Sequence, residues 1–257
     1  MDINSLHENT IIAVAQKEQA LAWMVTEGPL LEDPPLPMTA LRALVADQRI
    51  LRLRRGLYLA PRLDGRLPSL PRTLNLIDPD GYVSGHGALM LHGLNDQDIV
   101  AWYSVSPRRR GDIEYGQFRA HFVLSPDRAH AGSRVRIEVR GEPVTVATPA
   151  RALIDEIDLM PLGLDLAETA RVLRHALGSR VVSESGLITE LGRTPSVATA
   201  RRLGFLLEVV TGSRNATLLA LAHSIGGITR RPGEDIPELT WRLYLSQARN
   251  EIARRSR

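Results

Sequence analysis

The sequence has 257 residues, 44% of them hydrophobic, which is enough to bury a core in one large domain or two modest ones. It contains no cysteine, so disulfides and thiolate chemistry are excluded. The formal net charge is only +3 and Lys17 is the single lysine, so the distribution of arginines matters more than their total. No apolar run reaches the roughly 18 residues of a membrane span, and the N-terminal residues lack a signal-peptide pattern. We therefore expect a cytoplasmic protein without membrane contact.

The N-terminal part of the chain changes from helical periodicity to strand periodicity. Gly28-Pro29 ends the first helical pattern, and Arg54-Arg55-Gly56 supplies a turn in which glycine can adopt a positive φ. Helix, short helix and basic hairpin together predict a winged-helix domain at residues 1–62. Its elements are a helix at 8–26, a proline-rich stretch at 30–37, a short helix at 38–47 and a hairpin at 50–59.

The rest of the chain predicts a linker followed by a mixed domain. Residues 63–71 are rich in proline and lack periodicity, which is typical of a semi-rigid linker. The domain at 72–257 is predicted to be α+β over 72–147 and mostly helical over 148–257, where Thr148 can cap a helix that Pro149 begins. The predicted helices lie at 84–94, from 148 onward, and at 165–177, 183–191, 197–211, 214–224 and 237–257, and the strands at 99–105, 118–124, 134–140 and 143–147.

Arginines gather in the predicted hairpin and the helix before it. The window 49–62 holds five arginines and no acid, about three times the cation frequency expected from the whole chain. Such a hairpin can neutralise phosphates of a duplex, and the preceding helix can face the major groove. The alternative is a solvated strand face in an arginine-rich protein, and the proline-rich stretch leaves the docking geometry open. The candidate DNA-binding residues are Thr39, Arg42, Arg49, Arg52, Arg54 and Arg55, with a possible secondary contact through Arg108, Arg109 and Arg110.

Recognisable catalytic and cofactor patterns are missing from the sequence. His86 and His92 lie six residues apart, which is not the spacing of a helical metal pair, and Gly85-His86-Gly87 lacks the third glycine of a dinucleotide loop. We therefore predict no catalytic residue, no metal and no cofactor, and a protein that is not an enzyme. A degenerate metal-dependent nuclease that uses Asp155 or Glu138 beside Asp127 stays as the weaker alternative.

Four stretches of the sequence resemble the AbiEi family of type IV antitoxins. They occur in the family's order and span residues 50–210. The matching stretches are Leu53-Arg54-Arg55-Gly56-Leu57-Tyr58, the Gly85–Leu94 segment with His92-Gly93-Leu94, Thr148-Pro149-Ala150-Arg151-Ala152-Leu153-Ile154-Asp155, and Arg202-Leu203-Gly204-Phe205-Leu206-Leu207-Glu208.

The resemblance implies a DNA-binding repressor of a toxin–antitoxin, or abortive-infection, operon. Its partners would be double-stranded DNA at inverted repeats in its own promoter and a cognate nucleotidyltransferase-like toxin, with or without a stable complex. Ala150 departs from the family pattern, in which glutamate is common, and the proline-rich stretch replaces much of the helix before the recognition helix. The rival interpretation is a protein-interaction module without specific DNA binding.

Overall fold

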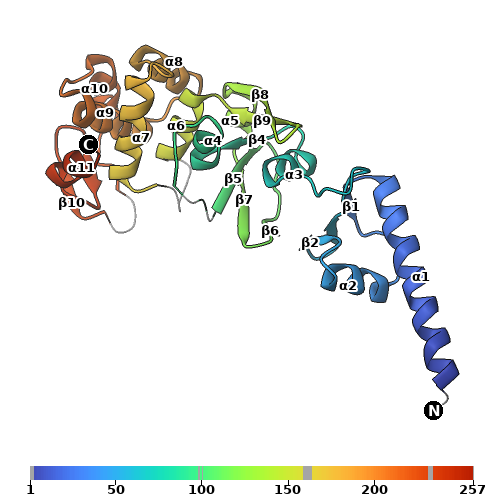
Figure 1. Ribbon diagram of the computed structural model, residues 1–257. Coiled ribbons are helices and arrows are strands. Elements are labelled where there is room, and N and C mark those ends of the chain that lie inside the picture. Colours follow the sequence, from blue (N-terminus) through green and yellow to red (C-terminus); the bar gives the residue numbers. More distant parts are fainter. Residues whose placement is uncertain (1–2, 98, 100, 159–163, 231–233, 257) are drawn as a thin grey trace.

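The computed structural model describes residues 3–97, 99, 101–158, 164–230 and 234–256, with side chains from residue 13 on. It is a mixed α+β protein, as predicted. A small N-terminal unit, here called the head (residues 3–60), lies at one end of a larger unit, the body (residues 70–256), and the body's sheet lies between the head and the C-terminal helices (Figure 1). Among the described helices, none combines the length and apolar character needed to cross a membrane.

The head is a three-stranded sheet with two helices. Its strands lie in the order β1-β3-β2, and both pairings are antiparallel. Gly56 has a φ of +76°, so the predicted glycine turn between β2 and β3 is confirmed. The short predicted strand pair and helix 38–47 are present, whereas β1 was not predicted. The head elements are α1 (Ile3–Glu27), β1 (Leu30–Glu32), α2 (Met38–Ala46), β2 (Leu51–Arg54) and β3 (Leu57–Leu59).

The sheet of the head is buried on both faces. Tyr58 and Leu31 face α1 and α2 and pack in the smaller core of the head. Leu53, Leu57 and Leu59, which are at most 3% exposed, belong instead to the large core of the body. The head is therefore fastened to the body through its own strands.

The body is built on a six-stranded mixed sheet in the order β6-β7-β5-β4-β9-β8. The β5–β7 and β4–β9 pairs are parallel, and the other pairs are antiparallel. Its strands are β4 (Tyr82–Ser84), β5 (Ala101–Ser106), β6 (Ile113–Tyr115), β7 (Phe118–Leu124), β8 (Arg134–Val139) and β9 (Glu142–Ala147), and the helices beside them are α3 (Leu70–Ile77), α4 (Gly85–Leu91) and α5 (Pro126–Ala131).

The C-terminal half of the chain is mostly helical. Thr148 accepts a hydrogen bond from the backbone N–H of Arg151 at 3.4 Å, so the predicted cap of the helix beginning at Pro149 is confirmed. A helix at 237–257 is wrong for most of that range, because Leu243–Leu245 pairs with Ile236–Glu238 as an antiparallel hairpin. The elements are α6 (Pro149–Asp158), α7 (Leu166–Gly178), α8 (Glu184–Arg193), α9 (Val197–Thr211), α10 (Ala216–His223), β10 (Ile236–Glu238), β11 (Leu243–Leu245) and α11 (Arg249–Arg255).

The predicted linker is held to the body near its C-terminal end, and Arg62 just before it is held as well. The Glu142 carboxylate lies 3.3 Å from Arg62 Nη1 and accepts the backbone N–H of Ser69 at 2.8 Å. The Tyr115 hydroxyl donates to the carbonyl of Pro68 at 2.6 Å. Helix α3 begins at Leu70, inside the predicted linker. Pro71 is tolerated in the first turn of a helix, and the apolar residues of α3 are buried against the body, which stabilises the helix.

Gly204 makes room for a buried tryptophan on helix α9. The Trp241 side chain is fully buried, and a Cβ at Gly204 would lie 2.7 Å from its Cε3 atom and closer still to its outer ring atoms. We expect Gly204→Ala to lower the free energy of unfolding by about 1–3 kcal/mol, because overpacking outweighs the gain in helix propensity. Gly192→Ala is the matched control, since nothing lies within 4 Å of its Cβ position in α8. Urea unfolding should show this control to be unchanged or slightly more stable, and a stabilising Gly204→Ala would contradict the packing argument.

Candidate nucleic-acid interface

The predicted recognition residues lie on the outer face of the head. Ala40, Leu41 and Leu44 of α2 pack inward, which leaves Thr39 and Arg42 exposed three residues apart on its outer face. No ion pair or hydrogen bond engages Arg42 among the described residues. This face of α2 is therefore open to a ligand.

The hairpin of strands β2 and β3, here called the head hairpin (Leu51–Leu59), carries three of the predicted arginines in different settings. Arg52 and Arg55 are exposed and make no ion pair or hydrogen bond within the described parts of the chain. Arg54 is half-buried, and its Nη1 donates to the carbonyl oxygen of Gly111 in the body at 3.1 Å. Arg52 and Arg55 are free to meet phosphates, whereas Arg54 fastens the hairpin to the body.

Arg49 is also engaged within the protein. Its Nη1 lies 2.5 Å from Glu18 Oε1 of α1, and the two side chains are 39% and 49% exposed. An exposed pair of this kind contributes little to stability and can exchange for a phosphate. Arg49 is therefore a weaker candidate for DNA contact than Arg52 or Arg55.

The predicted secondary arginines lie beside the head hairpin, because Gly111 follows them in the same loop. Arg108 faces Asp80 at 3.4 Å on the surface, and Arg110 lies 3.5 Å from the buried Asp78. Arg109 is exposed, and no ion pair is present for it among the described residues. The fold brings this loop to the turn end of the head hairpin, where Arg54 contacts Gly111, although 57 residues separate these two in the sequence.

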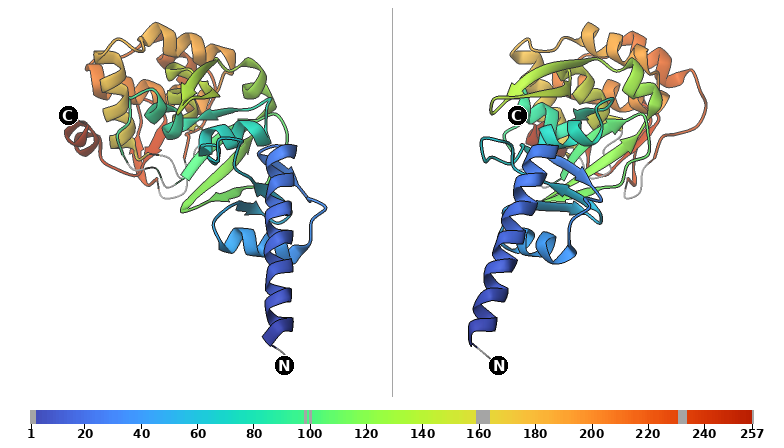
Figure 2. Two further views of the ribbon diagram at one scale, coloured as in Figure 1. Left: turned by 45° about the vertical axis from the view of Figure 1, so that its right-hand side comes forward. Right: turned by 90° about the vertical axis from the view of Figure 1, so that its right-hand side faces the viewer.

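A cleft of about 440 Å³ separates the head hairpin from the hairpin of strands β6 and β7, here called the body hairpin (Ile113–Leu124). Strand β2 lies against β6, and Figures 1 and 2 both show the body hairpin reaching toward the head beside β2. The head wall carries three arginines, and the body wall carries Arg119 together with two carboxylates. The cleft is lined by Arg52, Leu53, Arg54, Arg55, Asp112, Ile113, Glu114 and Arg119.

Arg119 was not among the residues predicted from sequence. It stands alone in its stretch of the chain, and only the pairing of β7 with β6 carries it to the head hairpin. A local excess of charge, the signal that identified the head hairpin, does not exist around it. Arg119 is identified as part of the cleft only by its position in the folded structure.

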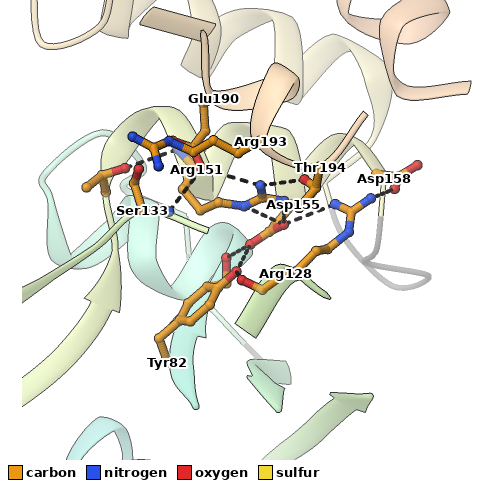
Figure 3. A network of polar contacts seen from close by, with 11 residues as sticks. Tyr82, Arg128, Ser133, Arg151, Asp155, Asp158, Glu190, Arg193 and Thr194 are labelled. Atoms are coloured by element: carbon orange, nitrogen blue, oxygen red, sulfur yellow. Dashed lines mark hydrogen bonds and ion pairs between the residues drawn. The ribbon is translucent and has the colours of Figure 1, made fainter. Parts of the chain in front are cut away.

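The acidic residues considered for nuclease chemistry are not gathered in a site. Asp155 is fully buried; its Oδ1 accepts from Arg151 Nε at 2.9 Å and from Arg128 Nη1 at 3.2 Å, and its Oδ2 accepts from the Ser84 hydroxyl at 2.7 Å (Figure 3). Both oxygens are therefore occupied by protein donors. Glu138 and Asp127 are exposed on β8 and α5. Among the described residues, no three His, Asp or Glu side chains lie together as a metal site would require.

The network around Asp155 joins four elements of the body. Arg151 and Asp155 come from α6, Arg128 from α5 and Tyr82 from β4, and Glu190 of α8 lies 3.4 Å from Arg151 (Figure 3). Burial raises the pKa of the Tyr82 hydroxyl, and the neighbouring Asp155 charge raises it further. The pKa of Arg151 is also raised: burial opposes its charge, but the hydrogen bond and the charge of Asp155 outweigh that effect. Asp155 and the two arginines therefore form a buried ion-pair network in which each charge is balanced by a neighbour.

His86 is a second buried titratable group. Its Nδ1 lies 3.2 Å from Glu156 Oε2, and its Nε2 lies 2.5 Å from the carbonyl oxygen of Ala101. Burial lowers the pKa of His86, but the hydrogen bond and charge of Glu156 together with the Ala101 carbonyl raise it by more, so the net shift is upward from 6.5. The charged ring suits this position because both nitrogens then donate.

The His86–Glu156 pair makes stability depend on pH. Because the folded-state pKa is raised, the contribution of the pair is complete below the unfolded value of 6.5 and is lost as pH rises through the folded pKa. His86→Gln should therefore lose more stability at about pH 6 than at about pH 9. Urea unfolding of both proteins at the two pH values checks this, and equal losses would contradict it.

Comparison with known proteins gives a likeness of fold. No protein-family model matches the chain, and no curated protein matches it. The crystal structure of the RV2827C protein from Mycobacterium tuberculosis is similar, with a TM-score of 0.54 and 13% sequence identity over 93% of this chain and 94% of that chain. At this identity the similarity establishes a shared fold over nearly the whole of both chains.

Proposed function

We propose that the chain is a DNA-binding antitoxin that represses its own operon. The observation that carries the proposal is the pair of unengaged arginines, Arg52 and Arg55, on a hairpin next to the exposed face of α2. Phosphate contacts by arginines on a hairpin and base contacts by the preceding helix are a common division of labour in DNA recognition. The partner would be duplex DNA at inverted repeats in the promoter.

The order of elements in the head supports its interpretation as a winged helix. A helix, a strand, a second helix and a hairpin follow one another, and the first strand pairs with the far strand of the hairpin in the order β1-β3-β2. Between β1 and α2, where the middle helix of a winged helix would lie, the chain has three prolines and a series of bends. Helix α2 would then be the recognition helix, with Thr39 and Arg42 facing the groove.

The antitoxin part of the proposal is supported by the sequence resemblance to the AbiEi family. In this role the protein acts in the cytoplasm, has no catalytic activity, and counteracts a nucleotidyltransferase-like toxin. Three of the four resembling stretches belong to the body, where they form α4, the start of α6 and part of α9. Co-expression of the chain with the product of a neighbouring nucleotidyltransferase gene should restore growth if the antitoxin assignment is right.

The DNA-binding part is tested by titrating the protein against the DNA upstream of its own gene at two salt concentrations, with unrelated DNA as competitor. We expect a sequence-selective complex whose affinity falls as salt rises, because phosphate contacts release counterions. Absence of a selective complex at both salts would refute the repressor and favour a protein-interaction module.

A further inference from the structure

The body hairpin presents an arginine to the same cleft that the head arginines line. Arg119 on β7 is 64% exposed, and its Nη2 lies 3.9 Å from Glu114 Oε1, which is itself 75% exposed. A solvated pair at this distance is weak, so the guanidinium can leave it for a phosphate. Asp112 is the other acid of the cleft, and its Oδ2 lies 2.7 Å from His121 Nδ1.

The two walls of the cleft are fixed relative to each other. Leu53 of the head hairpin and Ile113 of the body hairpin are each 1% exposed and belong to one core cluster. The hydrogen bond from Arg54 to Gly111 also joins head and body beside this core contact. The two residues are closely packed, because a Cβ at Gly111 would lie 2.6 Å from Arg54 Nη1. The arginines of head and body are therefore held at a set separation before any ligand arrives.

We propose that Arg119 is a DNA-contacting residue, so that head and body together grip one stretch of phosphate backbone along the cleft. The cleft is open and its arginines come from both walls, which suits a chain of phosphates that passes through rather than a small anion enclosed in it. The body hairpin lies on the side of the molecule where β2 and α2 lie (Figures 1 and 2). This inference rests on the proposed DNA binding and adds to it a contact outside the head.

The test is fluorescence anisotropy with the full chain and the upstream duplex over a range of salt. Arg119→Gln should weaken binding about tenfold and lower the salt slope by about one, as the loss of one phosphate contact requires. Glu114→Gln should strengthen binding because it removes a negative charge from the path of the phosphates. Arg136→Gln is the matched control, an exposed arginine on β8 at the opposite edge of the sheet, and should bind like wild type.

Failure of the inference differs visibly from failure of the proposed function. If wild type does not bind duplex DNA, the proposed function itself is wrong. If loss of Arg52 and Arg55 abolishes binding while Arg119→Gln binds normally, DNA binding stands and the contact by the body is refuted. Equal losses in Arg119→Gln and Arg136→Gln would also refute it, because the effect would then reflect net charge. Matching thermal unfolding curves establish that the variants are folded.

Discussion

Asp155→Asn is expected to lower the free energy of unfolding by about 3–5 kcal/mol, the range for breaking a buried ion pair. The aspartate accepts hydrogen bonds on both oxygens, from two arginines on one side and from Ser84 and Tyr82 on the other. An asparagine keeps the shape but turns an NH₂ group toward one of these sets of donors. It also leaves the fully buried Arg151 with less compensation for its charge.

Urea unfolding followed by circular dichroism measures this effect. Asp235→Asn is the control, because its pair with Arg230 is exposed on both sides and should contribute at most about 1 kcal/mol. A loss for Asp155→Asn as small as that of the control would mean that the buried network contributes little. Only a large difference between the two variants agrees with the geometry of Figure 3.

Replacing Arg52 and Arg55 together by alanine is expected to weaken DNA binding about a hundredfold. A hydrogen bond to a charged partner contributes about 1.5 kcal/mol or more, and each such loss corresponds to about tenfold in affinity. The slope of log affinity against log salt should become shallower by about two, since two phosphate contacts disappear. The loss should be similar for all DNA sequences, because phosphates carry no sequence information.

Arg42→Ala provides the contrast for the double variant. If α2 enters the major groove, this change should reduce preference for the operator over unrelated DNA more than it reduces the salt slope. Anisotropy titrations with operator and unrelated duplexes separate the two effects. An unchanged slope in the Arg52→Ala and Arg55→Ala double variant would remove the head hairpin from the interface.

The regular elements with strong local signals were predictable from the sequence. The hairpin around Gly56, the strand of alternating charged and apolar residues at 134–139 and the capped helix beginning at Pro149 all carry a complete pattern within a few residues. Short strands such as β1, β4 and β6 were missed because three residues are too few to show a period, and they exist only through pairing with distant strands. The C-terminal hairpin was missed because its apolar spacing also fits a helix.

The candidate site was predictable in part for the same reason. The clustering of arginines in the head hairpin was visible in the sequence. Which of these arginines are exposed and which one is hydrogen-bonded to the body was not. Arg54 is distinguished from Arg52 and Arg55 by its bond to Gly111, which lies 57 residues later in the chain. Arg119 enters the cleft through the antiparallel pairing of β6 and β7. Such relations come from tertiary packing and leave no trace in the composition of a short window.

The burial of the head sheet on both faces gives its leucines a second role. Leu53, Leu57 and Leu59 form the seam between head and body, so their volumes set the angle at which the head hairpin stands against the body hairpin. Exchanging one of them for a larger or smaller apolar residue changes the spacing of the arginines on either side without replacing an arginine. These leucines therefore set the distance between the two groups of arginines. In a related chain, changes at these buried positions can adapt the cleft to a ligand of different curvature, although the changed side chains do not contact the ligand.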